Sequence, residues 1–135
     1  MNIINLTPHS VDVVKECDFI NLEKLNETTW VADGLVDGSW VASYPSKGVA
    51  RISTSVENIE VPGLPGTAVV TKYGEATGIP EGIEENDVLI VSLPMQSMAV
   101  ASSHPLAHQM AVPYKVVRLR GNTSTMLGCM GFTFQ

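Results

Sequence analysis

Basic residues, aromatic residues and long apolar stretches are all scarce in this chain of 135 residues. Eight Lys and Arg residues stand against 14 Asp and Glu residues, which gives a formal net charge of −6, and only 6% of the residues are aromatic. Such a chain has little capacity to bind the nucleic-acid backbone, which needs a basic surface. Gly, Pro or charged residues also interrupt every apolar stretch before the ~18 residues that a membrane-spanning helix requires. We therefore expect neither polymeric nucleic acid nor a membrane among its partners.

Cysteine is almost absent as well. Cys17 and Cys129 lie near opposite ends of the sequence, without a CxxC spacing or a partner cluster, so we expect two free thiols. Residues 1–10 carry no basic segment followed by a long apolar one, and Pro8 interrupts the short apolar start. This is not the pattern of a secretory leader. The sequence therefore predicts a protein of a reducing compartment.

The motifs of the common catalytic and phosphate-binding loops are missing too. The chain contains no GxGxxG, no GxxxxGKS/T and no GxSxG. His104 and His108 have the spacing of two metal ligands on a helix, but Pro105 disfavours a helix there and no third ligand accompanies them. We therefore predict a binding protein with no metal, no cofactor and no catalytic residues. A small hydrolase that uses His9, His104 or His108 stays open as an alternative.

Short β-strands are what the remaining pattern favours. Val, Ile and Thr are plentiful, and Gly or Pro recurs every eight to twelve residues. We predict an α+β fold, a predominantly antiparallel β-sheet with one or two short helices, in a single domain over residues 1–135. The expected strands are 3–6, 11–14, 49–53, 59–61, 67–73, 87–92, 114–120 and 125–132, and the expected helix is 94–101.

Three of these expectations concern how the strands pair. The first two strands should form a hairpin around residues 7–10, and the last two a hairpin around residues 121–122. The strand at 87–92 is continuously apolar, which is typical of a central strand buried on both faces.

The segment from about residue 15 to 43 differs from the rest of the chain. It is polar and acidic, contains both tryptophans, Trp30 and Trp40, and has two Asp-Gly pairs that favour tight turns. We predict an inserted excursion, with a hairpin between Thr28 and Val41. Its tryptophans could cover a ligand or pack the insertion onto the body of the domain, and the sequence leaves both open.

A few basic and aromatic side chains are candidates for recognising an anion. Arg51 lies in an expected strand, Lys72 is next to Tyr73, and Arg118 and Arg120 alternate along a strand so that both should face one side. Guanidinium groups bind phosphate through paired hydrogen bonds, and an aromatic ring can stack on a base. Ordinary exposed charges on a sheet would give the same pattern.

The order of the motifs along the chain adds a family resemblance. The motifs are NLTPH at 5–9, YPSKGVARIS at 44–53, TKYGE at 71–75 with GIP at 78–80, IVS at 90–92, VP at 112–113 with VR at 117–118, and GC at 128–129. This series resembles small phage and prophage proteins that open on NLTPH, among them the first Thoeris anti-defence family.

The resemblance implies a function and an assembly. Members of that family are cyclic-nucleotide sponges, so it implies that the chain sequesters the cyclised ADP-ribose signal of bacterial TIR-domain defence proteins without cleaving it. Cyclic oligonucleotides are a further ligand class to consider. It also implies a homodimer or a larger assembly of dimers, in the cytoplasm of the bacterial host.

The resemblance also assigns site residues. Arg51 and Arg118 match positions where the family carries arginine, and Lys72, Tyr73 and Glu75 match its turn. With two further candidates the predicted ligand-binding set is Arg51, Lys72, Tyr73, Glu75, Gln96, Arg118 and Arg120. A phage interaction or assembly protein that acts on another protein through the 15–43 segment is the alternative from outside the ligand-binding class.

Overall fold

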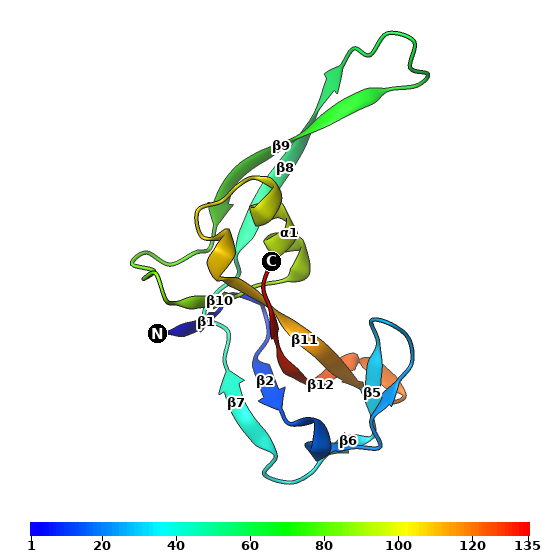
Figure 1. Cartoon of the computed structure of the whole chain (residues 1–135), viewed down its shortest axis with the longest axis vertical. Helices are drawn as coiled ribbons and strands as arrows, with labels where there is room; N and C mark the ends of the chain where they lie inside the picture. The colour runs from blue at the N-terminus through cyan, green and yellow to red at the C-terminus, as the bar shows by residue number, and fades with distance from the viewer.

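The structure, a computed structural model, describes residues 1–135 apart from the side chain of Trp40. It is an α+β fold made mostly of β-sheet, with one α-helix, as predicted (Figure 1). The strands are β1 (Ile3–Asn5), β2 (Val11–Val14), β3 (Phe19–Ile20), β4 (Glu23–Lys24), β5 (Trp30–Ala32), β6 (Gly34–Leu35), β7 (Trp40–Tyr44), β8 (Arg51–Ile59), β9 (Ala68–Thr77), β10 (Val88–Ile90), β11 (Met110–Leu119) and β12 (Asn122–Thr133). The helix is α1 (Leu93–Ala101), and 3₁₀ turns occur at Glu16–Asp18 and Ala107–Gln109.

The main sheet has the order β1-β10-β11-β12-β2-β7, and β5 joins β11 beyond the point where β10 ends. The predicted hairpin of β11 and β12 is confirmed. So is the central position of the apolar strand β10, which pairs in parallel with β1 and β11. Leu89 and Ile90 have no exposed surface. The predicted opening hairpin is wrong: β1 pairs with β10, while β2 pairs with β7 and β12.

Segment 15–43 packs onto the sheet. Trp30 of β5 pairs in parallel with Val117 of β11, and the next two residues of β5, Val31 and Ala32, are buried. The predicted hairpin between Thr28 and Val41 is wrong, because β5 pairs with β4 and β11 whereas β7 pairs with β2. The apolar residues of β5 are buried by β11, and a local hairpin would have left them without that cover.

The hairpin of β8 and β9 leaves the body of the domain and extends far beyond it (Figure 1). In place of the two expected strands 49–53 and 59–61 there is one strand, β8, which runs without a break from Arg51 to Ile59. Near its base Ile52 is buried against α1. Past an irregularity between Ile52 and Thr54 both faces are largely exposed. We refer to residues 54–73 as the arm.

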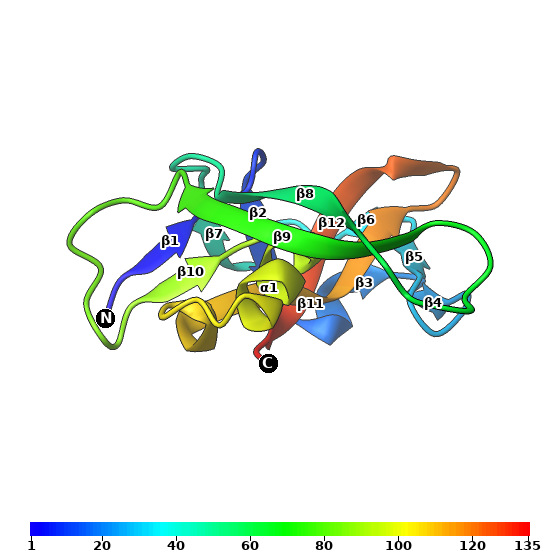
Figure 2. The ribbon, with the colours of Figure 1, turned by 90° about the horizontal axis from the view of Figure 1, so that it is seen from above.

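The helix α1 packs between the base of this hairpin and the main sheet (Figure 2). It begins at Leu93, one residue before the expected start, because the side chain of Ser92 accepts a hydrogen bond from the Met95 N–H and Pro94 occupies the first turn. Met95 and Ala99 are buried in the core. Among the described residues no helix has the length and apolar character needed to cross a bilayer.

Asp87 ties the N-terminal strand to the rest of the sheet. Its side chain is 3% exposed, and its two oxygens accept hydrogen bonds of 2.9 Å from the backbone N–H groups of Asn2 and Glu84. The N–H groups of Glu84 and then Asn2 hold the pKa of this carboxyl below its usual range.

This carboxylate should make stability depend on acidity. Because its pKa is lower in the folded chain, Asp87 stabilises the fold above about pH 4 and loses that contribution as the pH falls through the folded value. Asp87→Asn should therefore have a clearly lower Tm than the wild type at pH 7, with the difference shrinking below about pH 4. Thermal unfolding at several pH values measures the gap, and a gap independent of pH would exclude this role.

Candidate ligand-binding cleft

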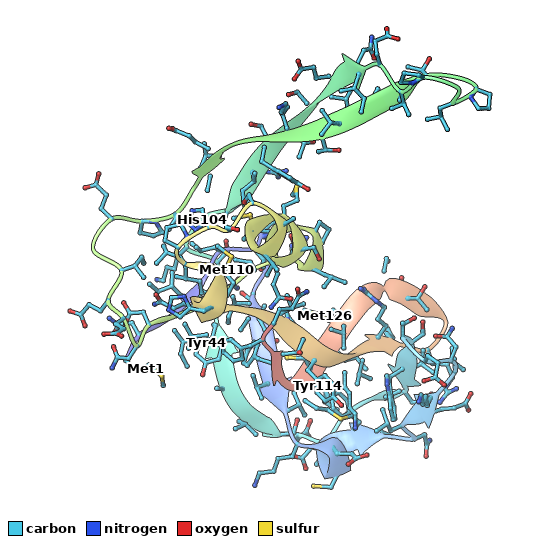
Figure 3. All side chains as sticks on the ribbon, turned by 45° about the horizontal axis from the view of Figure 1, so that its top comes forward. Met1, Tyr44, His104, Met110, Tyr114 and Met126 are labelled. Atoms are coloured by element: carbon cyan, nitrogen blue, oxygen red, sulfur yellow. The ribbon has the colours of Figure 1, made fainter. Side chains whose placement is uncertain are left out.

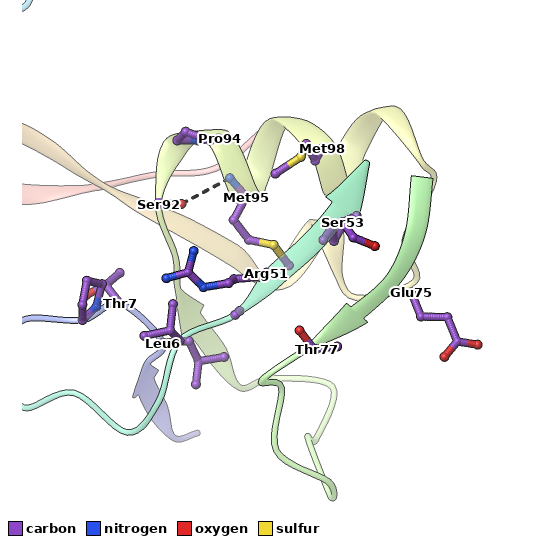
Figure 4. A pocket seen from close by; sticks show the side chains of 14 residues that line it. Leu6, Thr7, Arg51, Ser53, Glu75, Thr77, Ser92, Pro94, Met95 and Met98 are labelled. Carbon is purple, nitrogen blue, oxygen red and sulfur yellow. Dashed lines mark hydrogen bonds between the residues drawn. The ribbon is translucent and has the colours of Figure 1, made fainter. Parts of the chain in front are cut away.

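A cleft of about 580 Å³ lies at the base of the hairpin, between β8, β9, the turn after β1 and the start of α1 (Figure 4). Its apolar lining includes Leu6, Pro94, Met95 and Met98. Its polar lining consists of Arg51 and the hydroxyl groups of Thr7, Ser53, Thr77 and Ser92, and Glu75 borders it. An apolar lining with a few converging polar groups is typical of small-molecule sites.

The turn after β1 owes its shape to Asn5, which is 1% exposed. Its amide nitrogen donates to the carbonyls of His9 and Tyr44, both at 2.8 Å. Its side-chain oxygen accepts from the N–H of Thr7 at 3.0 Å and from the hydroxyl of the same residue at 2.6 Å. All four hydrogen-bonding positions of the amide are occupied. The NLTPH motif thus has a structural role, and it presents Thr7 and Pro8 to the cleft.

On the other side of the cleft, the backbone at Gly78 lies in close contact with the backbone at Val49. Gly78 follows β9 with φ +80°, and a Cβ there would collide with the Val49 carbonyl oxygen. Only glycine combines this φ with this contact. The approach aligns the hairpin base, where Arg51 and Thr77 are cross-strand partners.

Among the described residues, Arg51 is the only cationic one that lines the cleft. It is exposed, and among the described residues its guanidinium has no ion pair and no hydrogen-bond partner. The side chain extends toward the side of the cleft formed by Thr7 and Ser92, whereas the carboxylate of Glu75 points away from it (Figure 4). The N-terminus of α1 adds a partial positive charge on the same side. The arrangement can accept an anionic group.

Lys72 and Tyr73 lie on a second, wider hollow of about 620 Å³ between β9 and residues 102–105. Glu75 borders both hollows. The Lys72 ammonium lies 3.5 Å from the Glu57 carboxylate across the arm, and Tyr73 is 39% exposed. The structure thus places Arg51, Lys72, Tyr73 and Glu75 along one hairpin, in two adjoining hollows.

Gln96 is buried, with its side chain turned away from the cleft. Its amide nitrogen donates to the carbonyls of Met110 and Thr133, both at 3.1 Å, and its oxygen accepts from the Gln135 amide at 3.2 Å. These bonds attach α1 to β11 and to the C-terminal segment. Gln96 therefore has a structural position, and no polar atom of its side chain faces a ligand in the cleft.

Gln96→Leu should destabilise the fold by about 2 kcal/mol, because it leaves the buried Met110 carbonyl without its partner. Urea unfolding measures the loss. Ser97→Ala, on the exposed side of the same helix, is the matched control and should cost less than about 0.5 kcal/mol. Equal effects of the two substitutions would contradict the structural role.

Arg118 and Arg120 lie near the far end of β11 from α1. Figure 3 shows Met110 beside the helix and Tyr114 already well along the strand. The side chain of Arg118 donates to the Thr123 carbonyl at 3.3 Å. The strand ends at Leu119, so the prediction that both arginines alternate along it is wrong.

Arg120 instead holds segment 15–43 in place. Its Nε donates to the Asp33 carboxylate at 2.7 Å, one Nη donates to the Asn21 carbonyl at 2.8 Å, and the other lies 3.4 Å from the Glu23 carboxylate. Hydrogen bonds from Asn21 and Arg120 keep the pKa of Asp33 below its usual range. In a single copy of the chain, neither Arg118 nor Arg120 shares the cleft with Arg51.

The sequence did not single out the hydroxyl groups and methionines of the cleft. Ser53 and Thr77 are placed by the register of β8 and β9, and Met95 and Met98 by the packing of α1. No signal in the sequence pointed to Thr77, which lies four residues beyond the expected strand 67–73 and pairs with Arg51 only because β9 is longer than predicted. Comparisons with protein-family models, with curated proteins and with solved structures give no match to this chain.

Proposed function

We propose that the chain binds a small anionic, nucleotide-derived ligand in the Arg51 cleft and sequesters it unchanged. The observation that carries the proposal is an arginine without an internal partner at the rim of a cleft with an apolar lining. The volume of about 580 Å³ lies in the range of small-molecule sites.

The lining offers each part of a nucleotide a suitable partner. The Arg51 guanidinium can bind a phosphate through two parallel hydrogen bonds, helped by the partial charge of the α1 N-terminus. The hydroxyls of Ser53 and Thr77 can bond to ribose, and the half-buried side chain of Met98 provides polarizable surface for a base. These are recognition groups, which supports binding.

The resemblance of the sequence to the first Thoeris anti-defence family suggests which nucleotide. On that ground we propose the cyclised ADP-ribose signal, encountered in the cytoplasm of a bacterial host. A ligand of about 35 heavy atoms at roughly −0.3 kcal/mol per atom would reach about −10 kcal/mol, a Kd of some tens of nanomolar. Tight binding of the ground state serves sequestration, whereas it does nothing for the turnover of an enzyme.

A panel of cyclic nucleotides tests the proposal through ligand-induced stabilisation. A ligand at 100 times its Kd that binds only the folded chain adds about 2.7 kcal/mol, which for a domain of this size raises Tm by about 8 °C. We expect such a shift with cyclised ADP-ribose and a smaller one with linear ADP-ribose. No shift with any member of the panel would refute the proposal.

The arm supports a further part of the proposal, self-association. The cross-strand pairs Thr54–Tyr73, Val56–Thr71 and Asn58–Val69 lie on one face of the arm, and none of them is charged. The opposite face carries Glu57 and Lys72. Val56 is 67% exposed, and a lone two-stranded ribbon is marginally stable in water. A two-fold axis through the uncharged face would bring no like charges together, although the chain is acidic.

Val56→Asp should therefore halve the mass in light scattering, from a dimer to the 14.5 kDa monomer. Two carboxylates would face each other across the axis, which costs association free energy. Ser55→Asp places the same charge on the opposite face and is the matched control. A monomeric wild type, or equal effects of both variants, would contradict this assembly.

A further inference from the structure

A second cluster of cationic and aromatic side chains lies on segment 15–43 and β11, away from the Arg51 cleft. Trp30 of β5 has β4 on one side and β11 on the other. The ammonium of Lys24, its cross-strand partner on β4, lies 5.8 Å from the centroid of the indole. The ammonium of Lys115 on β11 lies 5.4 Å from the same ring and 5.5 Å from the ring of Tyr114.

The backbone of β11 is distorted at this point. Lys115 has φ +51°, a left-handed conformation that costs energy in a residue with a side chain. In a regular strand Tyr114 and Lys115 would point to opposite faces. Here the four consecutive residues 113–116 line one hollow of about 420 Å³, together with Lys24, Glu27, Thr28 and Trp30. The distortion thus brings the ring and the ammonium to the same hollow.

The charges of the hollow are unbalanced. Two of the eight basic residues of the chain converge on one indole ring. Glu27, the only acidic residue in the lining, lies 3.5 Å from the Lys24 ammonium, and its side chain is 95% exposed. Among the described residues Lys115 forms no ion pair. An anion entering here would meet two ammonium groups and one solvated carboxylate.

We propose that this hollow is a second binding site, for a phosphate monoester carried on a planar ring. Lys24 and Lys115 supply two positive charges to this hollow, which match the two negative charges of the phosphate. The ring stacks on Tyr114, which is 48% exposed. The strained backbone at Lys115 is retained because it directs this ammonium to the phosphate. The site shares no lining residue with the Arg51 cleft and does not depend on the function proposed for it.

Fluorescence of Trp30 provides a direct test, since the chain has two tryptophans and Trp40→Phe leaves only Trp30. In this background phenyl phosphate should change the emission in a saturable way, with a Kd below ~1 mM. Inorganic phosphate should bind at least about tenfold more weakly, because it lacks the ring. Adenosine monophosphate, run in parallel, shows whether the ring is preferred as a phenyl group or as a nucleoside base.

Substitutions of the two lysines separate binding from folding. Lys115→Gly removes the ammonium and the backbone strain together, so it should weaken binding at least about tenfold while Tm stays unchanged or rises. Lys24→Gln, which leaves the backbone intact, should weaken binding about fivefold or more. Lys47→Gln is the matched control outside the hollow and should have no effect.

Three results would overturn the proposal. They are no saturable change up to ~10 mM phenyl phosphate, equal affinity for inorganic and phenyl phosphate, and full affinity in both Lys24→Gln and Lys115→Gly. Loss of ligand from the Arg51 cleft in Arg51→Glu, with the Trp30 response intact, would show that the two sites are independent. The failure of one proposal can therefore be told from the failure of the other.

Discussion

Replacing Asn5 by aspartate should destabilise the fold by about 3 kcal/mol or more at neutral pH. The substitution keeps the size and the acceptor oxygen of the side chain but removes the two N–H donors. A buried carboxylate would then face the carbonyl oxygens of His9 and Tyr44, which at present accept those donors. The turn that positions Thr7 and Pro8 at the cleft would be lost with it.

Asn26 offers a matched control for this substitution. Its oxygen accepts from the N–H and the hydroxyl of Thr28, the same arrangement that Asn5 makes with Thr7. Among the described residues its amide nitrogen has no hydrogen-bond partner, and the residue is exposed. Asn26→Asp should therefore cost less than about 0.5 kcal/mol. Urea unfolding of both variants measures the difference, and similar losses would show that the donors of Asn5 do not matter.

Reversing the charge of Arg51 should have the largest effect on binding. Arg51→Glu removes the only cationic residue that lines the cleft and puts a carboxylate in its place, so affinity for the anionic ligand should fall by at least about 100-fold. Arg51 is exposed and has no internal partner among the described residues. The Tm of the Arg51→Glu variant without ligand should therefore stay within about 2 °C of that of the wild type.

Titration calorimetry with cyclised ADP-ribose measures this loss, and two further variants interpret it. Lys47→Glu makes the same change of charge outside the cleft lining and should retain affinity within about threefold. Arg118→Glu reverses a charge at the far end of β11. Full affinity in Arg51→Glu together with its loss in Arg118→Glu would move the site away from the cleft.

Much of the fold could be predicted because its signals are local. The apolar strand β10, the helix with Pro94 in its first turn and the hairpin of β11 and β12 each depend on neighbours in sequence. The pairing of β1 could not be predicted, since its partner β10 is more than 80 residues away in the sequence and the turn after β1 depends on a hydrogen bond from Asn5 to the distant Tyr44 carbonyl. The docking of β5 on β11 is likewise long-range.

The residues of the candidate site could likewise be predicted only in part. Arg51 and Glu75 were predicted and border one cleft because both lie on a single hairpin. Gln96 was predicted as a ligand contact, but its amide binds the carbonyls of Met110 and Thr133. The partners of Arg120 come from segment 15–43, whose position on the sheet a sequence pattern does not reveal. Polar side chains on a predicted strand or helix do not disclose which internal partners already occupy them.

Sequestration without cleavage is the central claim, and one measurement tests it most directly. The protein is incubated with cyclised ADP-ribose, separated from free ligand by gel filtration and then denatured by heat, and the released material is identified by mass spectrometry. We expect about one intact ligand to be released per protein chain, and none from Arg51→Glu after the same treatment. Recovery of a hydrolysed product, or wild-type protein that emerges without ligand, would contradict the account.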